Sequence, residues 1–327
     1  MRYRRLGRTG WQVSEVGYGM WGVGGGPGGW TGEDDRTSAA SLRLAVESGC
    51  NFFDTAWIYG RGHSERLLGG LLREHGARGL YVSTKIPPKD RAWPSRRDSR
   101  LEDVFPDDHV RCYLDKSREN VGVDRIDLLH YHVWEDSWAA DRRWQDQVRA
   151  MKSEGLVGAV GISVNRWEPW NVLAAIATGL VDVVQVIYNI FDQAPEDRLF
   201  DVCAAHDVGV IARVPFDEGT LTGTLTEDTR WPEGDWRSSY FVPDNLAASV
   251  ERAERLRPVV PEGMTMPELA LRFVLQHPAV ATVIPGMRRP EHVRANLGVS
   301  DGVRLSERLM SRLREHRWDR QPTEWSQ

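Results

Sequence analysis

The sequence predicts one α/β domain over residues 1–327, folded as a (β/α)8 TIM barrel with long loops on its C-terminal face. Eight short apolar runs alternate with amphipathic runs along the chain, and no break in composition divides them. Each apolar run is hydrophobic on both faces, which is typical of a buried parallel strand. Eight strands that alternate with helices in a chain of this length favour a closed barrel.

The expected elements follow one another in the order that such a barrel requires. Strands are expected at 13–19, 51–54, 81–85, 126–131, 158–163, 183–188, 209–214 and 281–284. Helices are expected at 38–48, 64–74, 107–120, 144–153, 169–178, 195–205 and 267–276. Two of these helices begin with hydroxyl or acidic side chains, Ser64-Glu65 and Asp107-Asp108, which favour a helix N-terminus.

Three connections are longer than a barrel needs, at 87–106, 133–141 and 216–245. They follow the third, fourth and seventh strands, so we expect them at the C-terminal face, where barrels carry their active sites. Long loops at that face are more often lids or substrate walls than spacers.

The main alternative is an open doubly wound sheet, which needs a glycine-rich turn after its first strand. Gly24, Gly26 and Gly29 match G-x-G-x-x-G formally, but six of the eight residues from 22 to 29 are glycine. The segment continues into Trp30-Thr31-Gly32-Glu33 and not into an apolar helix. We therefore interpret it as a flexible loop and keep the barrel.

The charge balance excludes some classes of partner. The 42 Lys and Arg residues against 47 Asp and Glu residues give a net charge of −5, whereas nucleic-acid and membrane-surface binders usually carry a basic excess. Cys50, Cys112 and Cys203 form no C-x-x-C pair, so neither a disulfide framework nor a zinc motif is expected. The N-terminal residues lack the apolar core of a secretory signal, and no run approaches 18 apolar residues, so we expect a cytoplasmic protein.

Three consecutive strands each end in a titratable residue: Asp54, Lys85 and His132. In a closed barrel these strand ends converge on one patch, and Tyr59 follows Asp54 closely enough to join them. A tyrosine hydroxyl has a pKa near 10, which a nearby lysine ammonium would lower. Such a group can protonate an oxygen on which negative charge develops, but the electrons must come from elsewhere because no strong nucleophile is present.

These residues resemble the aldo-keto reductases, the NAD(P)H-dependent (β/α)8 oxidoreductases, over essentially the whole chain. Asp54-Thr55-Ala56, Tyr59-Gly60, Ser64-Glu65 and Leu68-Gly69 are similar to the family's most specific signature. Residues 3–14 are similar to the family's N-terminal β-hairpin under the barrel. The resemblance implies that Tyr59 is the general acid, that Lys85 tunes its pKa, that Asp54 pairs with Lys85 and that His132 orients the carbonyl.

His130 and His132 lie two residues apart, so strand alternation places them on the same side and cannot separate them. His132 lies nearer the C-terminal mouth, and the family's histidine lies five residues after the strand's aspartate, here Asp127. We therefore assign the catalytic role to His132 and expect His130 to fill the barrel interior.

The resemblance implies nicotinamide ligands at the ends of later strands. Gly161-Ile162-Ser163 is similar to the motif whose serine binds the nicotinamide amide, and Asn165 and Gln185 are the accompanying candidates. Val164 separates Ser163 from Asn165, whereas the family's asparagine usually follows directly. Arg213 stands where the family usually has an aromatic residue that stacks on the nicotinamide, and a planar guanidinium can also stack on a ring.

The resemblance also implies two phosphate-binding segments. In the first, the backbone of Gly219, Leu221 and Gly223 would contact the pyrophosphate, since glycine permits a close approach. The second is similar to the adenosine-phosphate segment and contributes Gly286, Arg288, His292 and Asn296. Because a guanidinium matches phosphate oxygens, Arg288 is the best candidate for a 2′-phosphate and favours NADPH over NADH.

Tryptophan is unusually frequent, with 14 residues against 8 tyrosines and 8 phenylalanines. Seven of the tryptophans fall on segments expected at the C-terminal face, and we predict that Trp21, Trp57 and Trp134 are substrate walls. An aromatic cleft of this kind favours a bulky or cyclic carbonyl substrate over a small aldehyde.

These observations predict an NADPH-dependent reductase of aldehydes, ketones or keto-sugars. One alternative is a cofactor-binding regulatory subunit with little turnover, as some relatives in the family are. Another is a metal-dependent hydrolase on the same barrel, because His130-x-His132 can be a metal-ligand pair. That alternative needs further ligands at other strand ends, and only Asp54 qualifies.

Overall fold

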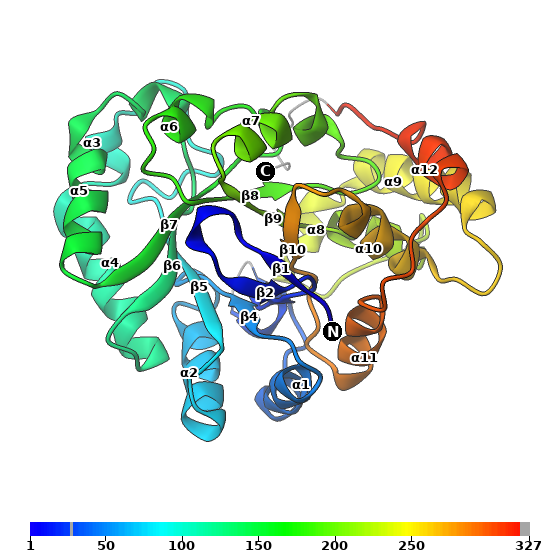
Figure 1. Cartoon of the computed structure of the whole chain (residues 1–327). Coiled ribbons are helices and arrows are strands. Elements are labelled where there is room, and N and C mark those ends of the chain that lie inside the picture. Colours follow the sequence, from blue (N-terminus) through cyan, green and yellow to red (C-terminus); the bar gives the residue numbers. More distant parts are fainter. Residues whose placement is uncertain (27–28, 321–327) are drawn as a thin grey trace.

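The computed structural model of the chain describes residues 1–26 and 29–320, and its centre is one eight-stranded sheet (Figure 1). The strands follow chain order across the sheet, from β3 to β10, and every neighbouring pair is parallel. They are β3 (Tyr18–Gly19), β4 (Phe52–Asp54), β5 (Tyr81–Ile86), β6 (Ile126–Tyr131), β7 (Val157–Ser163), β8 (Val183–Ile187), β9 (Gly209–Arg213) and β10 (Val280–Val283).

The first and last strands meet and close the sheet into a barrel. Val16 bridges Val283 and Gly19 bridges Gly286, both in parallel. The Gly17 amide donates to the Val283 carbonyl at 2.8 Å, and the Gly19 amide donates to the Pro285 carbonyl at 3.0 Å. Closure leaves no free sheet edge, and it confirms the expected (β/α)8 barrel.

An N-terminal hairpin of β1 (Tyr3–Arg5) and β2 (Gln12–Ser14) covers the end of the barrel where the strands begin. Leu6, at its turn, is fully buried against barrel residues that include Phe52 and Leu128. Gly7 has φ +47, and a Cβ atom there would lie 2.2 Å from the Gly209 nitrogen. The hairpin therefore closes the barrel floor. It also divides the strand expected at 13–19 between β2 and the short β3.

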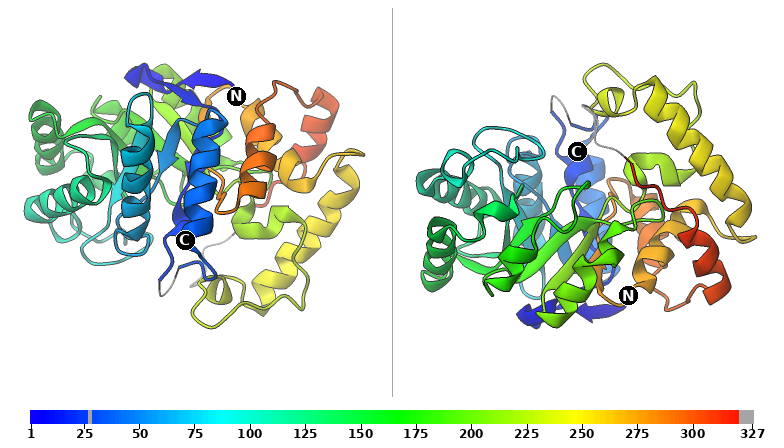
Figure 2. Two further views of the ribbon diagram at one scale, coloured as in Figure 1. Left: turned by 90° about the horizontal axis from the view of Figure 1, so that it is seen from below. Right: turned by 90° about the horizontal axis from the view of Figure 1, so that it is seen from above.

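Helices surround the sheet, and Figure 2 shows the hairpin at one end of the barrel with the loops of residues 216–241 at the other. The helices are α1 (Asp35–Glu47), α2 (His63–His75), α3 (Leu101–Val104), α4 (Asp107–Val121), α5 (Arg142–Ser153), α6 (Leu173–Ala177), α7 (Leu199–Ala205), α8 (Arg237–Tyr240), α9 (Pro243–Leu256), α10 (Met266–Gln276), α11 (Pro290–Gly298) and α12 (Glu307–Arg314). Most of the predicted helices appear within a few residues of their expected positions.

Besides the divided first strand, three predicted segments differ from the structure, and one of them, the long loop expected at 87–106, contains the short helix α3. The helix expected at 169–178 is reduced to α6, because Asp136 from another loop accepts hydrogen bonds from the amides of Ala174 and Ala175 and fixes where that helix begins. The long loop expected at 216–245 contains α8 and the first turn of α9, which begins at Pro243.

The main hydrophobic core lies between the sheet and the helices, and a smaller core fills the barrel floor. Within residues 1–26 and 29–320, none of the helices is both long enough and apolar enough to cross a bilayer.

Candidate active site

A buried ion pair joins the ends of β4 and β5. The Lys85 Nζ donates to the Asp54 Oδ1 at 2.5 Å and to the Thr55 carbonyl at 2.7 Å. The second carboxylate oxygen of Asp54 accepts from the Ser83 hydroxyl at 2.7 Å and from the Gln185 amide at 2.8 Å. Both ion-pair partners are almost completely buried. These bonds fix the direction of the ammonium group, because every atom of the carboxylate is already held.

Tyr59 lies directly above this pair, on the turn that links β4 to α2. The Lys85 Nζ is 5.1 Å from the centre of the Tyr59 ring, and the His132 ring meets it edge-on at 6.0 Å. Trp21 stacks on the Tyr59 ring, with the ring centres 6.1 Å apart. Gly24 allows the first loop to approach, since a Cβ atom there would lie 2.8 Å from the Tyr59 carbonyl carbon. The structure thus brings together the four residues predicted as a tetrad.

Burial controls the ionisation of Tyr59 and His132. Burial raises the pKa of Tyr59 above its ordinary value, and the charges of Lys85 and Arg213 oppose that effect without reversing it. We expected Lys85 to lower the pKa of Tyr59, and its charge does act in that direction, but desolvation is larger. Burial, helped by the charges of Lys85 and Arg213, also holds the pKa of His132 well below its usual range. The site therefore presents a protonated phenol beside a neutral imidazole.

His130 lies below this cluster, inside the barrel. It is fully buried between Lys85 on β5 and Gly161 on β7, its neighbours in the sheet register. A Cβ atom on Gly161 would lie 2.4 Å from the His130 Nδ1, so the glycine leaves the space that the ring fills. Neither ring nitrogen has a partner among the described residues, and burial lowers the pKa to about 3.

Of the residues predicted to bind the nicotinamide, Ser163 and Arg213 end β7 and β9, and Gln185 lies in the middle of β8. Ser163 and Gln185 are paired in register and buried at the barrel mouth. The Arg213 guanidinium donates to the Val164 carbonyl at 3.0 Å, and its Nε has no partner among the described residues. Asn165 faces its own loop, where its side chain accepts from the Glu168 amide at 2.8 Å. Ser163, Gln185 and Arg213 therefore lie around the mouth, whereas Asn165 is occupied in a turn.

The two predicted phosphate segments expose backbone at the same end of the barrel. A Cβ atom on Gly219 or Gly286 would meet no described atom within 4 Å. Leu221 is buried beneath the first segment, and Gly223 ends it with φ +69. Asn296 is buried and its amide reaches the Gly286 carbonyl at 3.5 Å. Accessible backbone of this kind suits a phosphate group.

The positions of the predicted adenosine-phosphate side chains differ. Arg288 is half-buried and donates to the Thr31 carbonyl at 2.8 Å. Burial and the nearby charges of Arg237 and Arg289 lower the pKa of its guanidinium. His292 lies exposed on α11. Arg288 is therefore the member of this set that connects the phosphate segment to the first loop.

Of the three predicted substrate walls, only Trp21 lies against Tyr59. Trp57 packs edge-on against Tyr113 of α4 at 4.6 Å. Trp134 does not form a wall: it is 2% exposed and packs against Trp138 at 5.6 Å and Trp144 at 5.0 Å. The chain turns after β6, and this turn directs Trp134 into the core on the helical side.

Two other tryptophans approach the site, and the prediction had not selected them. Trp93 meets the His132 ring edge-on at 5.6 Å. Trp236 packs on Trp21 at 4.7 Å, and Trp30 meets both of these rings. The Trp236 amide also donates to the Gly29 carbonyl at 3.2 Å, so the first loop and the loop after β9 are joined. The sequence places these tryptophans in long loops at the barrel mouth, which was the only signal of their role. The two-residue alternation that tells the direction of a strand side chain does not apply in a loop.

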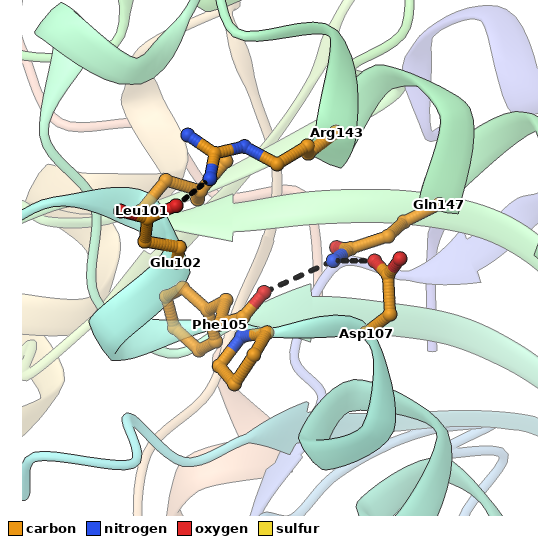
Figure 3. A pocket seen from close by; sticks show the side chains of 7 residues that line it. Leu101, Glu102, Phe105, Asp107, Arg143 and Gln147 are labelled. Atoms are coloured by element: carbon orange, nitrogen blue, oxygen red, sulfur yellow. Dashed lines mark hydrogen bonds and ion pairs between the residues drawn. The ribbon is translucent and has the colours of Figure 1, made fainter.

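A cavity of about 220 Å³ lies elsewhere, among α3, α4 and α5 (Figure 3). Gln147 in its wall donates to the Phe105 carbonyl at 3.0 Å and accepts from the Tyr131 hydroxyl at 2.8 Å. Tyr131 alternates along β6 with His130 and His132, so this cavity is on the opposite face of the strand.

In the described part of the chain, no group of three or more His, Cys, Asp or Glu side chains could hold a metal ion, so the hydrolase alternative lacks its ligand set.

Comparison with known proteins gives a consistent result. A family model described as "Aldo/keto reductase family" matches residues 15–317. The NADH-specific methylglyoxal reductase of Escherichia coli (strain K12) is 28% identical over 323 residues, which cover 95% of this chain and 96% of that protein. The glycerol dehydrogenase of Gluconobacter oxydans has a similar structure, with a TM-score of 0.75, 25% identity and coverage of 93% and 91%. An aldo-keto reductase from Bacillus halodurans in its holo form also has a TM-score of 0.75, at 22% identity and 99% coverage of both chains.

Proposed function

The chain belongs to the aldo/keto reductase family, whose members use nicotinamide cofactors, and we propose that it is an NADPH-dependent carbonyl reductase with Tyr59 as general acid. The observation that carries this proposal is the cluster at the ends of β4, β5 and β6. It combines a protonated tyrosine, a buried lysine–aspartate pair and a neutral histidine. The Lys85 Nζ lies 5.1 Å and the His132 ring 6.0 Å from the centre of the Tyr59 ring.

In the proposed reaction the carbonyl carbon would accept a hydride, which is the chemistry that a dihydronicotinamide would supply when bound at this mouth. Tyr59 donates its hydroxyl proton to the carbonyl oxygen as negative charge develops there. Lys85 stabilises the resulting phenolate, and Asp54 holds the ammonium in place through the 2.5 Å contact. The neutral His132 orients the carbonyl oxygen toward Tyr59 by hydrogen bonding. Trp21 packs on Tyr59 and Trp93 packs on His132, so we expect their rings to limit the access of water to the reacting atoms.

The chain's own residues fit a dinucleotide at this mouth. Arg213 has a buried guanidinium nitrogen without a partner in the described residues, where the resemblance expects a group that stacks on the nicotinamide. Ser163 and Gln185 lie beside it for the carboxamide. The open backbone at Gly219 and Gly286 suits the phosphates.

We prefer NADPH to NADH because Arg288 lies at the adenosine-phosphate segment and is followed directly by Arg289. Arg237 also lies near Arg288, but its guanidinium is already paired with Asp235 at 2.7 Å. The guanidinium groups of Arg288 and Arg289 would favour the two extra charges of a 2′-phosphate. The relative from Escherichia coli is named as NADH-specific, so nucleotide preference differs among similar proteins. The aromatic rings of Trp21, Trp93 and Trp236 favour a bulky or cyclic carbonyl substrate.

Titration of the purified protein with NADPH and with NADH, followed by quenching of tryptophan fluorescence, tests the cofactor proposal. Absorbance at 340 nm with a panel of small, cyclic and aromatic carbonyls then tests the reaction. We expect NADPH to bind at micromolar concentrations and to be oxidised with at least the cyclic or aromatic substrates. Failure of both nucleotides to bind would refute the proposed function, and binding without oxidation would favour a regulatory role.

A further inference from the structure

The last described residues, 317–320, cross the loops at the barrel mouth. The Trp318 amide donates to the Phe191 carbonyl at 2.8 Å. The exposed Arg317 guanidinium forms a two-pronged pair with Asp197, with both contacts at 2.7 Å. Arg320 then turns inward, and its side chain is only 5% exposed. Arg317 also pairs with Asp319 at 2.8 Å, so the segment carries one arginine with surface ion pairs and one arginine that enters the interior.

Arg320 completes a buried network that joins three barrel loops. Its Nη2 lies 2.5 Å from the Asp217 Oδ1 and 3.1 Å from the Asp192 Oδ2. Arg166 contacts the same Asp217 oxygen at 3.3 Å. Both arginines also reach the Tyr240 hydroxyl, at 3.2 Å from Arg320 and 2.6 Å from Arg166. Asp217 is completely buried, and the two guanidinium groups are the charged partners of its carboxylate oxygen.

Asp217 begins a strained stretch of backbone. Asp217 has φ +46, Glu218 has φ +57 and Gly219 has φ +117, three consecutive left-handed residues of which two are not glycine. Such conformations are unfavourable for residues with a Cβ atom and persist only when their surroundings hold them. The same stretch leads directly into the segment 219–223, whose backbone is open at Gly219. The side chain of Asp217 is therefore the point at which the network can hold this segment.

We propose that Arg320 is a positioning residue for the nucleotide pyrophosphate, acting through Asp217 on the backbone of residues 219–223. This proposal rests on the proposed function, because it assumes that this segment contacts the pyrophosphate. The side chain of Arg320 bonds to Asp192, Asp217 and the Tyr240 hydroxyl, so it would act on the segment through these contacts. It keeps the left-handed turn in place, so that the backbone amides are already directed when the phosphates arrive. Preorganisation of this kind increases affinity by removing the cost of ordering the loop on binding.

The test compares Arg320→Met with Arg320→Lys and with the control Arg317→Met. Kd values are measured for NADPH, for ADP-ribose, which contains the pyrophosphate, and for adenosine 2′-monophosphate, which lacks it. We expect Arg320→Met to raise the Kd of NADPH and of ADP-ribose about tenfold, the effect of losing one buried charged hydrogen-bond contact. We expect the Kd of adenosine 2′-monophosphate to stay within about twofold, and kcat at saturating NADPH to change far less than the Kd.

Arg320→Lys keeps the charge and should recover part of the affinity, while Arg317→Met should resemble the wild type because its ion pair is exposed. Circular dichroism separates these effects from unfolding, and if Arg320→Met does not fold, Arg320→Lys still decides through its ADP-ribose affinity. Unchanged ADP-ribose affinity in the folded Arg320 variants would overturn the proposal, as would equal effects of Arg317→Met and Arg320→Met. A wild-type protein that binds neither NADPH nor ADP-ribose would instead refute the proposed function on which it rests.

Discussion

The two sides of the barrel mouth are built differently. On the side of β4 to β6, Asp54 and Lys85 stand on strand ends and contact each other directly at 2.5 Å. On the side of β7 to β10, the candidate nucleotide residues lie mainly on loops, which rely on left-handed backbone and on a network that ends at Arg320. The strand ends thus fix the side chains of the proposed chemistry directly, whereas the loops of the proposed binding surface are held by side chains that are distant in the sequence.

This contrast predicts a division of labour. Changes on the β4–β6 side should reduce turnover without weakening nucleotide binding, and changes on the β7–β10 side should do the reverse. The variants Tyr59→Phe, Arg288→Leu and His130→Leu separate the two sides or show that they act as one unit.

The largest effect is expected from Tyr59→Phe. The phenylalanine ring preserves the contacts with Trp21 and His132 but has no proton to donate, so turnover should fall about a thousandfold. The Kd of NADPH, measured by fluorescence quenching, should stay within about twofold. Tyr113→Phe on α4, where Tyr113 packs against Trp57, is the matched control and should retain wild-type turnover. An equal loss of turnover and of NADPH binding in Tyr59→Phe would show that the two sides do not have separate roles.

A smaller effect is expected from Arg288→Leu on the other side. Loss of the guanidinium should raise the Kd of NADPH about tenfold and leave the Kd of NADH nearly unchanged, because only NADPH carries the 2′-phosphate. Arg294→Leu, on the exposed surface of α11, is the control for general charge. If Arg288→Leu weakens NADPH and NADH equally, Arg288 holds the loop at Thr31 and does not select the nucleotide.

The smallest effect is expected from His130→Leu. His130 lies on β6, inside the barrel and below the candidate catalytic residues. The change removes a buried imidazole whose nitrogens find no partner in the described residues, so the free energy of unfolding should rise by about 1 kcal/mol. Turnover should remain within about threefold, as expected for a residue that only fills the barrel. Urea denaturation and steady-state kinetics measure the two quantities, and His132→Leu is the comparison that should lose turnover. A tenfold loss in His130→Leu would instead give His130 a part in the chemistry.

The positions of the β4–β6 residues could be predicted from the sequence because strand periodicity and a short motif determine where they lie. Asp54 and Lys85 follow directly from where buried strands end, and Tyr59 follows five residues after Asp54. The barrel class followed from the same alternation. Helix α9 could have been found as well, since Pro243 at its first turn precedes apolar residues at helical spacing, including Leu246 and Leu256.

Tertiary packing on irregular segments was not predictable in the same way. Trp134 lies two residues beyond His132, but the chain turns there and the ring enters the core. Trp93 approaches His132 from a loop to which no periodicity applies. The contact between Arg320 and Asp217 joins residues 103 positions apart, and the sequence around neither residue predicts it. Each of these positions depends on contacts between loops that are distant in the sequence, and such contacts leave no periodic pattern in the sequence.

The pH dependence of hydride transfer in a single turnover tests most directly whether Tyr59 is the acid. Reduction needs the protonated phenol, so the rate should be full below the pKa of Tyr59 and lost as pH rises through it. Burial raises that pKa above its ordinary value, so the rate at saturating NADPH should be level from about pH 6 to about pH 9. If His132 were the acid, its low pKa would make the rate fall already between acidic and neutral pH. A rate that falls in that way would contradict the account.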